Sequence, residues 1–142
     1  MTAALPATPP YRHVLAVPPT GSAVRIARET TELVLAECGV GPRHPSVGPA
    51  LLILAELVTN AVRHAAAVTP VITVTYAHGP GVFAFAVHDR HPYQPPLFGA
   101  LATAPGSGLA TVVEMTMELG GTAVQCGDAD GRGKSIRITL PL

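Results

Sequence analysis

Four polar residues at helical spacing interrupt an otherwise apolar segment near the middle of the sequence. They are Glu56, Asn60, Arg63 and His64, within ELVTNAVRHA at residues 56–65. Residues three and four apart share one side of a helix, and Glu56 and Asn60 would lie about 6 Å apart along its axis. A solvent-facing stripe would suit Arg63 and Glu56, but an Asn inside a helix competes for backbone hydrogen bonds. The pattern alone therefore leaves a solvent-facing stripe and a functional site equally open.

A carboxylate beside a carboxamide has a clear chemical use if the ligand is a phosphate with bound Mg²⁺. Mg²⁺ prefers oxygen ligands, and it usually takes one or two from the protein and the rest from water and substrate phosphates. Glu56 and Asn60 offer such oxygens one helical turn apart. The carboxylate could also orient or deprotonate a hydroxyl or a water molecule that attacks the phosphate.

Two further features could complete such a site. Asp89 follows the apolar segment VFAFAVH, where a lone Asp most often forms a turn but could accept a hydrogen bond from an exocyclic amine such as that of adenine. Gly106 and Gly108 open a predicted helix, and a glycine-rich helix start lets backbone N–H groups approach a phosphate. Residues 131–135, GRGKS, precede the last predicted strand, where a simple hairpin loop is the alternative.

Hydrophobic periodicity predicts the elements that hold these residues. Ile136, Ile138 and Leu140 alternate with polar residues, which is the period of a half-buried strand. The predicted elements sum to an α+β fold, a two-layer sandwich of one mostly antiparallel sheet covered on one face by about three helices. Residues 1–10 would form a flexible tail and residues 11–142 one domain. The predicted helices span about residues 22–38, from residue 46 or 49 to residue 66, and 106–120. The predicted strands span about residues 11–17, 72–76, 82–88, 122–126 and 135–142.

The composition argues against several classes of function. The 142 residues suffice for one domain with its own core. A formal net charge of zero and a pI of about 7.0 lack the electrostatic footprint of a nucleic-acid or anionic-membrane binder. No signal sequence begins the chain, and no apolar run approaches the ~20 residues of a membrane span. Cys38 and Cys126 lack metal-binding spacing and are expected to be buried thiols in a reducing compartment, so a cytoplasmic protein is expected.

The segments ELVTNAVRHA, VHD, GSGLATVVE and GKSIRITLPL, in this order, resemble the Bergerat-fold ATPases of the gyrase, heat-shock chaperone, histidine kinase and mismatch-repair group. Within this group the sequence is most similar to the small anti-sigma factor serine kinases, the histidine kinase-like ATP-binding regulatory proteins. The resemblance covers about residues 12–142, and ELVTNAVRHA is its most specific motif. It implies the Bergerat ATP-binding fold, with ATP and Mg²⁺ as cofactors.

The resemblance also implies a role for each residue of the site. Asn60 would bind the Mg²⁺ that bridges the ATP phosphates, and Glu56 would act as the general base for a substrate serine hydroxyl. Asp89 would accept a hydrogen bond from the adenine amine, with Ser135 beside it. Gly106 and Gly108 would flank the phosphates. The basic residues Arg63 and His64 would support the site.

The sequence departs from the wider group in two ways. The segment after Asp89 reads DRHPYQPP rather than a glycine-rich turn, as in the regulatory subgroup. The lid, residues 92–105, contains no Lys or Arg, although a transferring phosphoryl group needs cations near its oxygens. Mg²⁺, Arg63, Arg90 or Lys134 would have to supply that charge.

Two functions follow as hypotheses. The first is a partner-switching regulator that binds a sigma factor and, with Mg-ATP, phosphorylates a serine or threonine of an antagonist protein. The second is a non-catalytic, ATP-dependent module that sequesters a partner without phosphoryl transfer. The retained Glu56 favours the first, and the cation-poor lid favours the second. A complete sensor kinase, topoisomerase or chaperone is not expected at this length, and homodimers are common in the resembled family.

Overall fold

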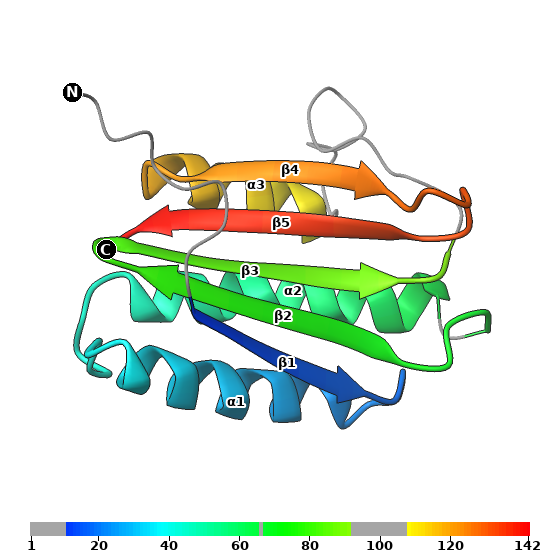
Figure 1. The fold of residues 1–142 in the computed structure, drawn as a ribbon, viewed down its shortest axis with the longest axis horizontal. Helices are drawn as coiled ribbons and strands as arrows, with labels where there is room; N and C mark the ends of the chain where they lie inside the picture. Colours follow the sequence, from blue (N-terminus) through cyan, green and yellow to red (C-terminus); the bar gives the residue numbers. More distant parts are fainter. Residues whose placement is uncertain (1–10, 66, 92–107) are drawn as a thin grey trace.

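The fold is a two-layer sandwich in which three helices cover one face of a five-stranded sheet (Figure 1). A computed structural model describes residues 11–65, 67–91 and 108–142. Neighbouring strands all pair antiparallel, in the order β1-β2-β3-β5-β4. The predicted α+β class, with one antiparallel sheet and three helices, is confirmed. The elements are β1 (Tyr11–Val17), α1 (Ala23–Glu37), α2 (Val47–Ala65), β2 (Ile72–Gly79), β3 (Val82–Asp89), α3 (Gly108–Glu118), β4 (Thr122–Gly127) and β5 (Lys134–Pro141).

Period-2 alternation decides which face of the sheet each side chain occupies. On β5, Ile136, Ile138 and Leu140 are buried beneath the helices, as their alternation with polar residues predicts. Phe83 and Phe85 on the neighbouring β3 are fully buried on the same side. Burying each of these large side chains contributes about 1.5–3 kcal/mol, so the helix-facing side of the sheet carries most of the stabilisation.

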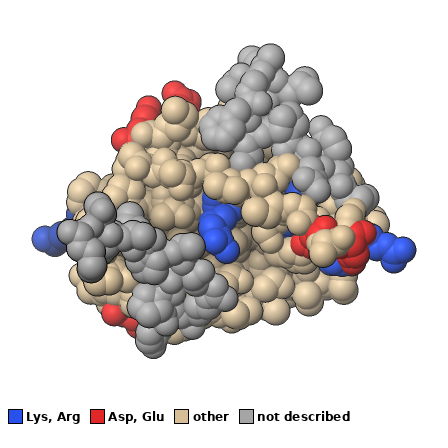
Figure 2. All heavy atoms as spheres, turned by 45° about the horizontal axis from the view of Figure 1, so that its top comes forward, with Lys and Arg blue, Asp and Glu red and all other residues tan. Residues whose placement is uncertain are grey.

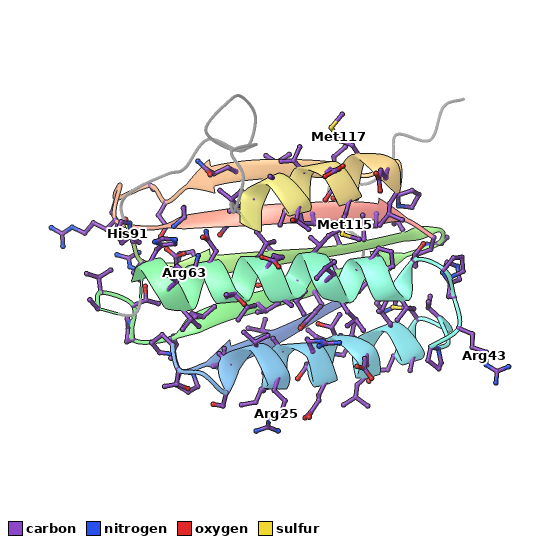
Figure 3. The ribbon with its side chains drawn as sticks, turned by 180° about the vertical axis from the view of Figure 1, so that it is seen from behind. Arg25, Arg43, Arg63, His91, Met115 and Met117 are labelled. Atoms are coloured by element: carbon purple, nitrogen blue, oxygen red, sulfur yellow. The ribbon has the colours of Figure 1, made fainter. Side chains whose placement is uncertain are left out.

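Helix α2 is the centre of the helical layer, and it contacts both α1 and α3 as well as β2 and β3 (Figure 3). Its residues Leu54, Leu57, Val58 and Ala61 recur three and four apart and are all buried. The predicted helix from residue 46 or 49 to residue 66 is confirmed to within two residues at each end. Because α2 is packed on three sides, any polar side chain on it must face the remaining side.

Two glycines end α1 and α3 in the same way. Gly39 follows α1 with φ 80, and the Val40 N–H donates to the Leu35 carbonyl at 2.9 Å. Gly120, with φ 76, follows α3, and the Gly121 N–H donates the equivalent bond to the Thr116 carbonyl at 2.9 Å. This left-handed glycine closes the last helical turn and reverses the chain. It sends α1 into the connection to α2, and α3 into β4.

The two cysteines do not share one environment. Cys38 is half-buried after α1, whereas Cys126 is exposed on β4, which is an edge strand of the sheet. The expectation of two buried thiols is therefore wrong for Cys126, because an edge strand with one uncovered face leaves its outward side chains in water. Among the described helices, none is long and apolar enough to cross a membrane.

Candidate functional site

The polar stripe of α2 divides into a half-buried part and an exposed part. Glu56 and Asn60 are half-buried, while Arg63 and His64 are exposed in the last turn of the helix. Figure 3 shows Arg63 at the same end of the molecule as His91, which follows β3. The stripe thus runs along α2 toward the end of the sheet where β3 finishes.

Glu56 reaches from α2 to the first residue of α3. A Cβ atom built on Gly108 would lie 2.6 Å from the Glu56 Oε2 atom, so a side chain there would displace this carboxylate from its present position. The helix dipole favours negative charge at such an N-terminus, where backbone N–H groups have no partner within the helix. Gly108 was predicted to allow a close approach, and the group that approaches it here is Glu56. Gly106 lies outside the described residues.

Asp89 forms a buried ion pair with Lys134. The Lys134 Nζ atom donates to Asp89 Oδ1 at 2.9 Å and to Oδ2 at 3.0 Å, and both residues are only 5% exposed. The His91 N–H donates to Oδ1 at 2.9 Å. The sheet register creates the pair, since Asp89 and Lys134 are directly opposite each other in the β3–β5 ladder. Alternation turns both side chains toward the helices, in line with Val87 and Ile136.

Ser135 is not brought together with Asp89. It is opposite His88 in the register, and one step along a strand turns a side chain to the other face of the sheet. Lys134 instead occupies the position beside Asp89, which sequence reasoning assigned to Ser135. The missed signal was the alternation itself, because Lys134 is two residues before the buried Ile136 and so belongs to the helix-facing set.

Charged side chains also tie the β4–β5 connection to the end of β3. Arg90 donates to Asp128 Oδ2 at 2.9 Å and to Asp130 Oδ2 at 2.8 Å, and His88 Nε2 lies 2.8 Å from Asp128 Oδ2. The hydrogen bond between Arg90 and Asp130 lowers the pKa of the Asp130 carboxyl from its usual value. The same bond raises the pKa of the Arg90 guanidinium. Acidic and basic atoms accordingly gather at this end of the otherwise mostly uncharged face in Figure 2. Gly133 has no room for a side chain, since its Cβ would lie 2.7 Å from the backbone carbonyl oxygen of Asp89 and would also meet the Asp128 carboxylate.

These contacts determine which cations remain available to a phosphate. Arg90 pairs with two carboxylates and Lys134 with a third. Of the three protein cations proposed to meet the phosphates, Arg63 is the one that is exposed, on α2. Among residues 11–65, 67–91 and 108–142, no three His, Cys, Asp or Glu side chains form a metal site. The oxygens of Glu56 and Asn60 nevertheless fit Mg²⁺ bound through one or two protein groups plus phosphates.

The layered fold, with the polar end of α2 beside the end of β3, is that of an α/β sandwich domain. The profile of the histidine kinase-, DNA gyrase B- and HSP90-like ATPases matches residues 48–142. The chain belongs to this family, and membership implies ATP binding. No curated protein matches the chain in sequence.

The solved structures that are similar to this chain include histidine kinases. A blue-light activated histidine kinase domain of Erythrobacter litoralis aligns with TM-score 0.55 and 21% identity over 68% of this chain and 44% of its own. Full-length ShkA in complex with AMPPNP aligns with TM-score 0.57 and 22% identity, over 83% of this chain and 29% of its own. The histidine kinase AdeS of Acinetobacter baumannii aligns with TM-score 0.54 and 16% identity, over 92% of this chain and 67% of its own. At such identities the likeness shows the fold alone, and the chain spans less than half of the first of these proteins.

Proposed function

We propose that this chain binds Mg-ATP and acts as an anti-sigma factor that phosphorylates a serine or threonine of an antagonist protein. The observation that carries the proposal is the placement of Glu56, with its carboxylate at the N-terminus of α3 and Asn60 one turn further along α2. A carboxylate and an amide oxygen one helical turn apart offer the oxygen ligands that Mg²⁺ prefers when it is bound to phosphates. A cytoplasmic location, a sigma-factor partner and a homodimer belong to the same proposal.

Each residue has a distinct task in this proposal. The Asn60 amide oxygen holds the Mg²⁺ that neutralises phosphate charge when it is bound. The Glu56 carboxylate orients the attacking hydroxyl and accepts its proton. Asp89 accepts a hydrogen bond from the base of the nucleotide. Arg63, exposed at the end of the stripe, supports the phosphates together with His64, and Gly106 and Gly108 flank them.

The second candidate is a non-catalytic module that uses ATP only to hold a partner. The engagement of the cations favours it, since Arg90 and Lys134 are bound to carboxylates rather than free to meet a transferring phosphoryl group. Phosphoryl transfer depends almost entirely on such charge stabilisation and on positioning. The kinase reading rests on Glu56, because a pure binding module has no use for a general base.

Nucleotide binding is tested by thermal unfolding with and without Mg-ATP. A ligand that binds only the folded state adds about 2.7 kcal/mol at a concentration 100 times its dissociation constant, so the melting temperature should rise. Asn60→Ala should abolish most of that rise. Thr59→Ala, at the exposed neighbouring position of α2, is the matched control and should retain it. A wild-type protein that shows no shift would overturn the nucleotide site.

Phosphoryl transfer is tested with labelled ATP and proteins recovered from the native cell by pull-down with Mg-ATP. Glu56→Gln should lower the rate of antagonist phosphorylation by roughly 10²- to 10⁴-fold, as expected for loss of a general base. Glu114→Gln changes an exposed glutamate of α3 and should leave the rate unchanged. If ATP binds and no recovered partner is labelled, the non-catalytic module is the function.

A further inference from the structure

The Asp89–Lys134 pair keeps unused hydrogen-bonding capacity. Among the described residues, Asp89 Oδ1 accepts two bonds, from Lys134 and from the His91 N–H, while Oδ2 accepts one, from Lys134. The Lys134 ammonium has three N–H donors, and two of them go to Asp89 within the part of the chain that the structure describes. Since each carboxylate oxygen has two lone pairs, one acceptor and one donor remain side by side.

This leftover pair is complementary to more than one purine. The adenine edge presents a donor, the 6-amino group, next to an acceptor, N1. A 6-oxopurine presents the reverse, an acceptor O6 next to a donor N1–H. The free acceptor of the carboxylate can take the 6-amino donor of adenine, and the free donor of the ammonium can serve O6 of a 6-oxopurine. The two kinds of base then differ in which of the two side chains their 6-substituent meets.

We infer that Lys134 is a specificity-determining residue that opens the nucleotide site to 6-oxopurine nucleotides as well as to adenine nucleotides. The inference rests on the proposed function, in which Asp89 receives the base. A carboxylate without Lys134 would face the lone pairs of O6, and such a repulsive contact is the means by which a site rejects a near relative of its ligand. Lys134 removes the repulsion and supplies the missing donor.

The setting of the pair supports a role in recognition. Both side chains are almost wholly buried, at 5% exposed, and lie in register at the end of two hydrogen-bonded strands. Gly133 lets the backbone after the β4–β5 connection close on Asp89, because a Cβ there would lie 2.7 Å from the Asp89 carbonyl oxygen. A donor and an acceptor fixed in this way lose little conformational freedom when a base binds.

The test compares ATP with ITP, which differs only at the 6-position and N1 of the base, by titration calorimetry at fixed Mg²⁺. Wild-type protein should bind ITP within about 10-fold of ATP. Lys134→Met should weaken ITP roughly 10- to 100-fold more than ATP, the effect expected for loss of one charged hydrogen bond. Arg132→Met removes an equal charge from the exposed part of the same connection and should leave the ratio unchanged.

Each other outcome has a definite meaning. Wild-type protein that binds ATP but rejects ITP by more than about 100-fold overturns the inference and leaves the proposed function standing. Lys134→Met that weakens both nucleotides equally, or tightens ATP, makes the pair a structural contact only. Should that variant fail to fold, the wild-type ratio still decides, and Lys134→Arg, which retains charged donors, should keep ITP binding. Wild-type protein that binds neither nucleotide overturns the proposed function itself.

Discussion

Two polar contacts among the described residues are buried but differ in kind, one between α1 and β2 and one at the end of β3 and β5. In the first contact, the Thr31 hydroxyl of α1 lies 2.8 Å from the Tyr76 hydroxyl of β2 and donates to the Ala27 carbonyl at 2.7 Å. Both side chains are neutral and fully buried. At the end, Asp89 and Lys134 are charged and almost as deeply buried. The first contact joins helix to sheet, while the second joins two strands beside the candidate site.

The two contacts differ in how much of their hydrogen-bonding capacity remains unused. The two hydroxyls share one bond and direct another to the backbone of the same helix, so the core closes on itself. The ion pair costs far more to desolvate, and burying two charges is seldom the most stable solution for a fold. Its retained donor and acceptor are therefore better explained by a ligand than by stability.

The largest predicted effect comes from breaking the ion pair. Asp89→Leu strands the buried Lys134 ammonium and should lower the free energy of unfolding by about 3–5 kcal/mol in urea titrations. The double variant Asp89→Leu with Lys134→Met should recover a large part of that loss, because an apolar pair carries no desolvation cost. A single variant within 1 kcal/mol of wild type would mean that water reaches the pair, and the contrast with Tyr76 would fail.

The same contrast shows what the sequence could predict. Period-2 and helical patterns predict the three helices, the strands and the inward set of β5, because these depend on residues close in the chain. The Asp89–Lys134 pair depends on the register between β3 and β5, strands separated by a helix and another strand. Glu56 against Gly108 is likewise a contact between two helices. Such partners are set by tertiary packing, so the residues were predicted and their contacts were not.

The neutral contact should reveal itself at high pH. Burial raises the pKa of Tyr76 to about 12, although its bond with Thr31 lowers it somewhat. A pKa raised on folding contributes stability that is present below the unfolded value near 10 and is lost as the pH rises toward 12. The loss is on the order of 3 kcal/mol for a pKa that rises from about 10 to about 12.

Tyr76→Phe isolates this contribution. The variant should cost about 1 kcal/mol at pH 7, and its free energy of unfolding relative to wild type should rise between pH 10 and 12. Thr31 keeps its bond to the Ala27 carbonyl in this variant, so no hydroxyl donor is stranded. Parallel pH profiles for the two proteins would show that Tyr76 is not the group that titrates, and that the core contact is less closed than the structure indicates.

The smallest predicted effect comes from an ion pair that resembles the buried one in chemistry but not in setting. Arg90 Nη2, just after β3, lies 2.8 Å from Asp130 Oδ2 on the exposed β4–β5 connection. Hydrogen bonding to Arg90 lowers the pKa of Asp130, so the stability that it contributes is present above the ordinary carboxyl pKa and is lost as the pH falls through the lowered value. Asp130→Asn should shift the urea midpoint at pH 6 least of all the variants, and high salt should erase the shift, since exposed pairs are screened. A shift as large as that of Asp89→Leu would mean that burial does not set the strength of these ion pairs, and the contrast between the buried and the exposed pair would fail.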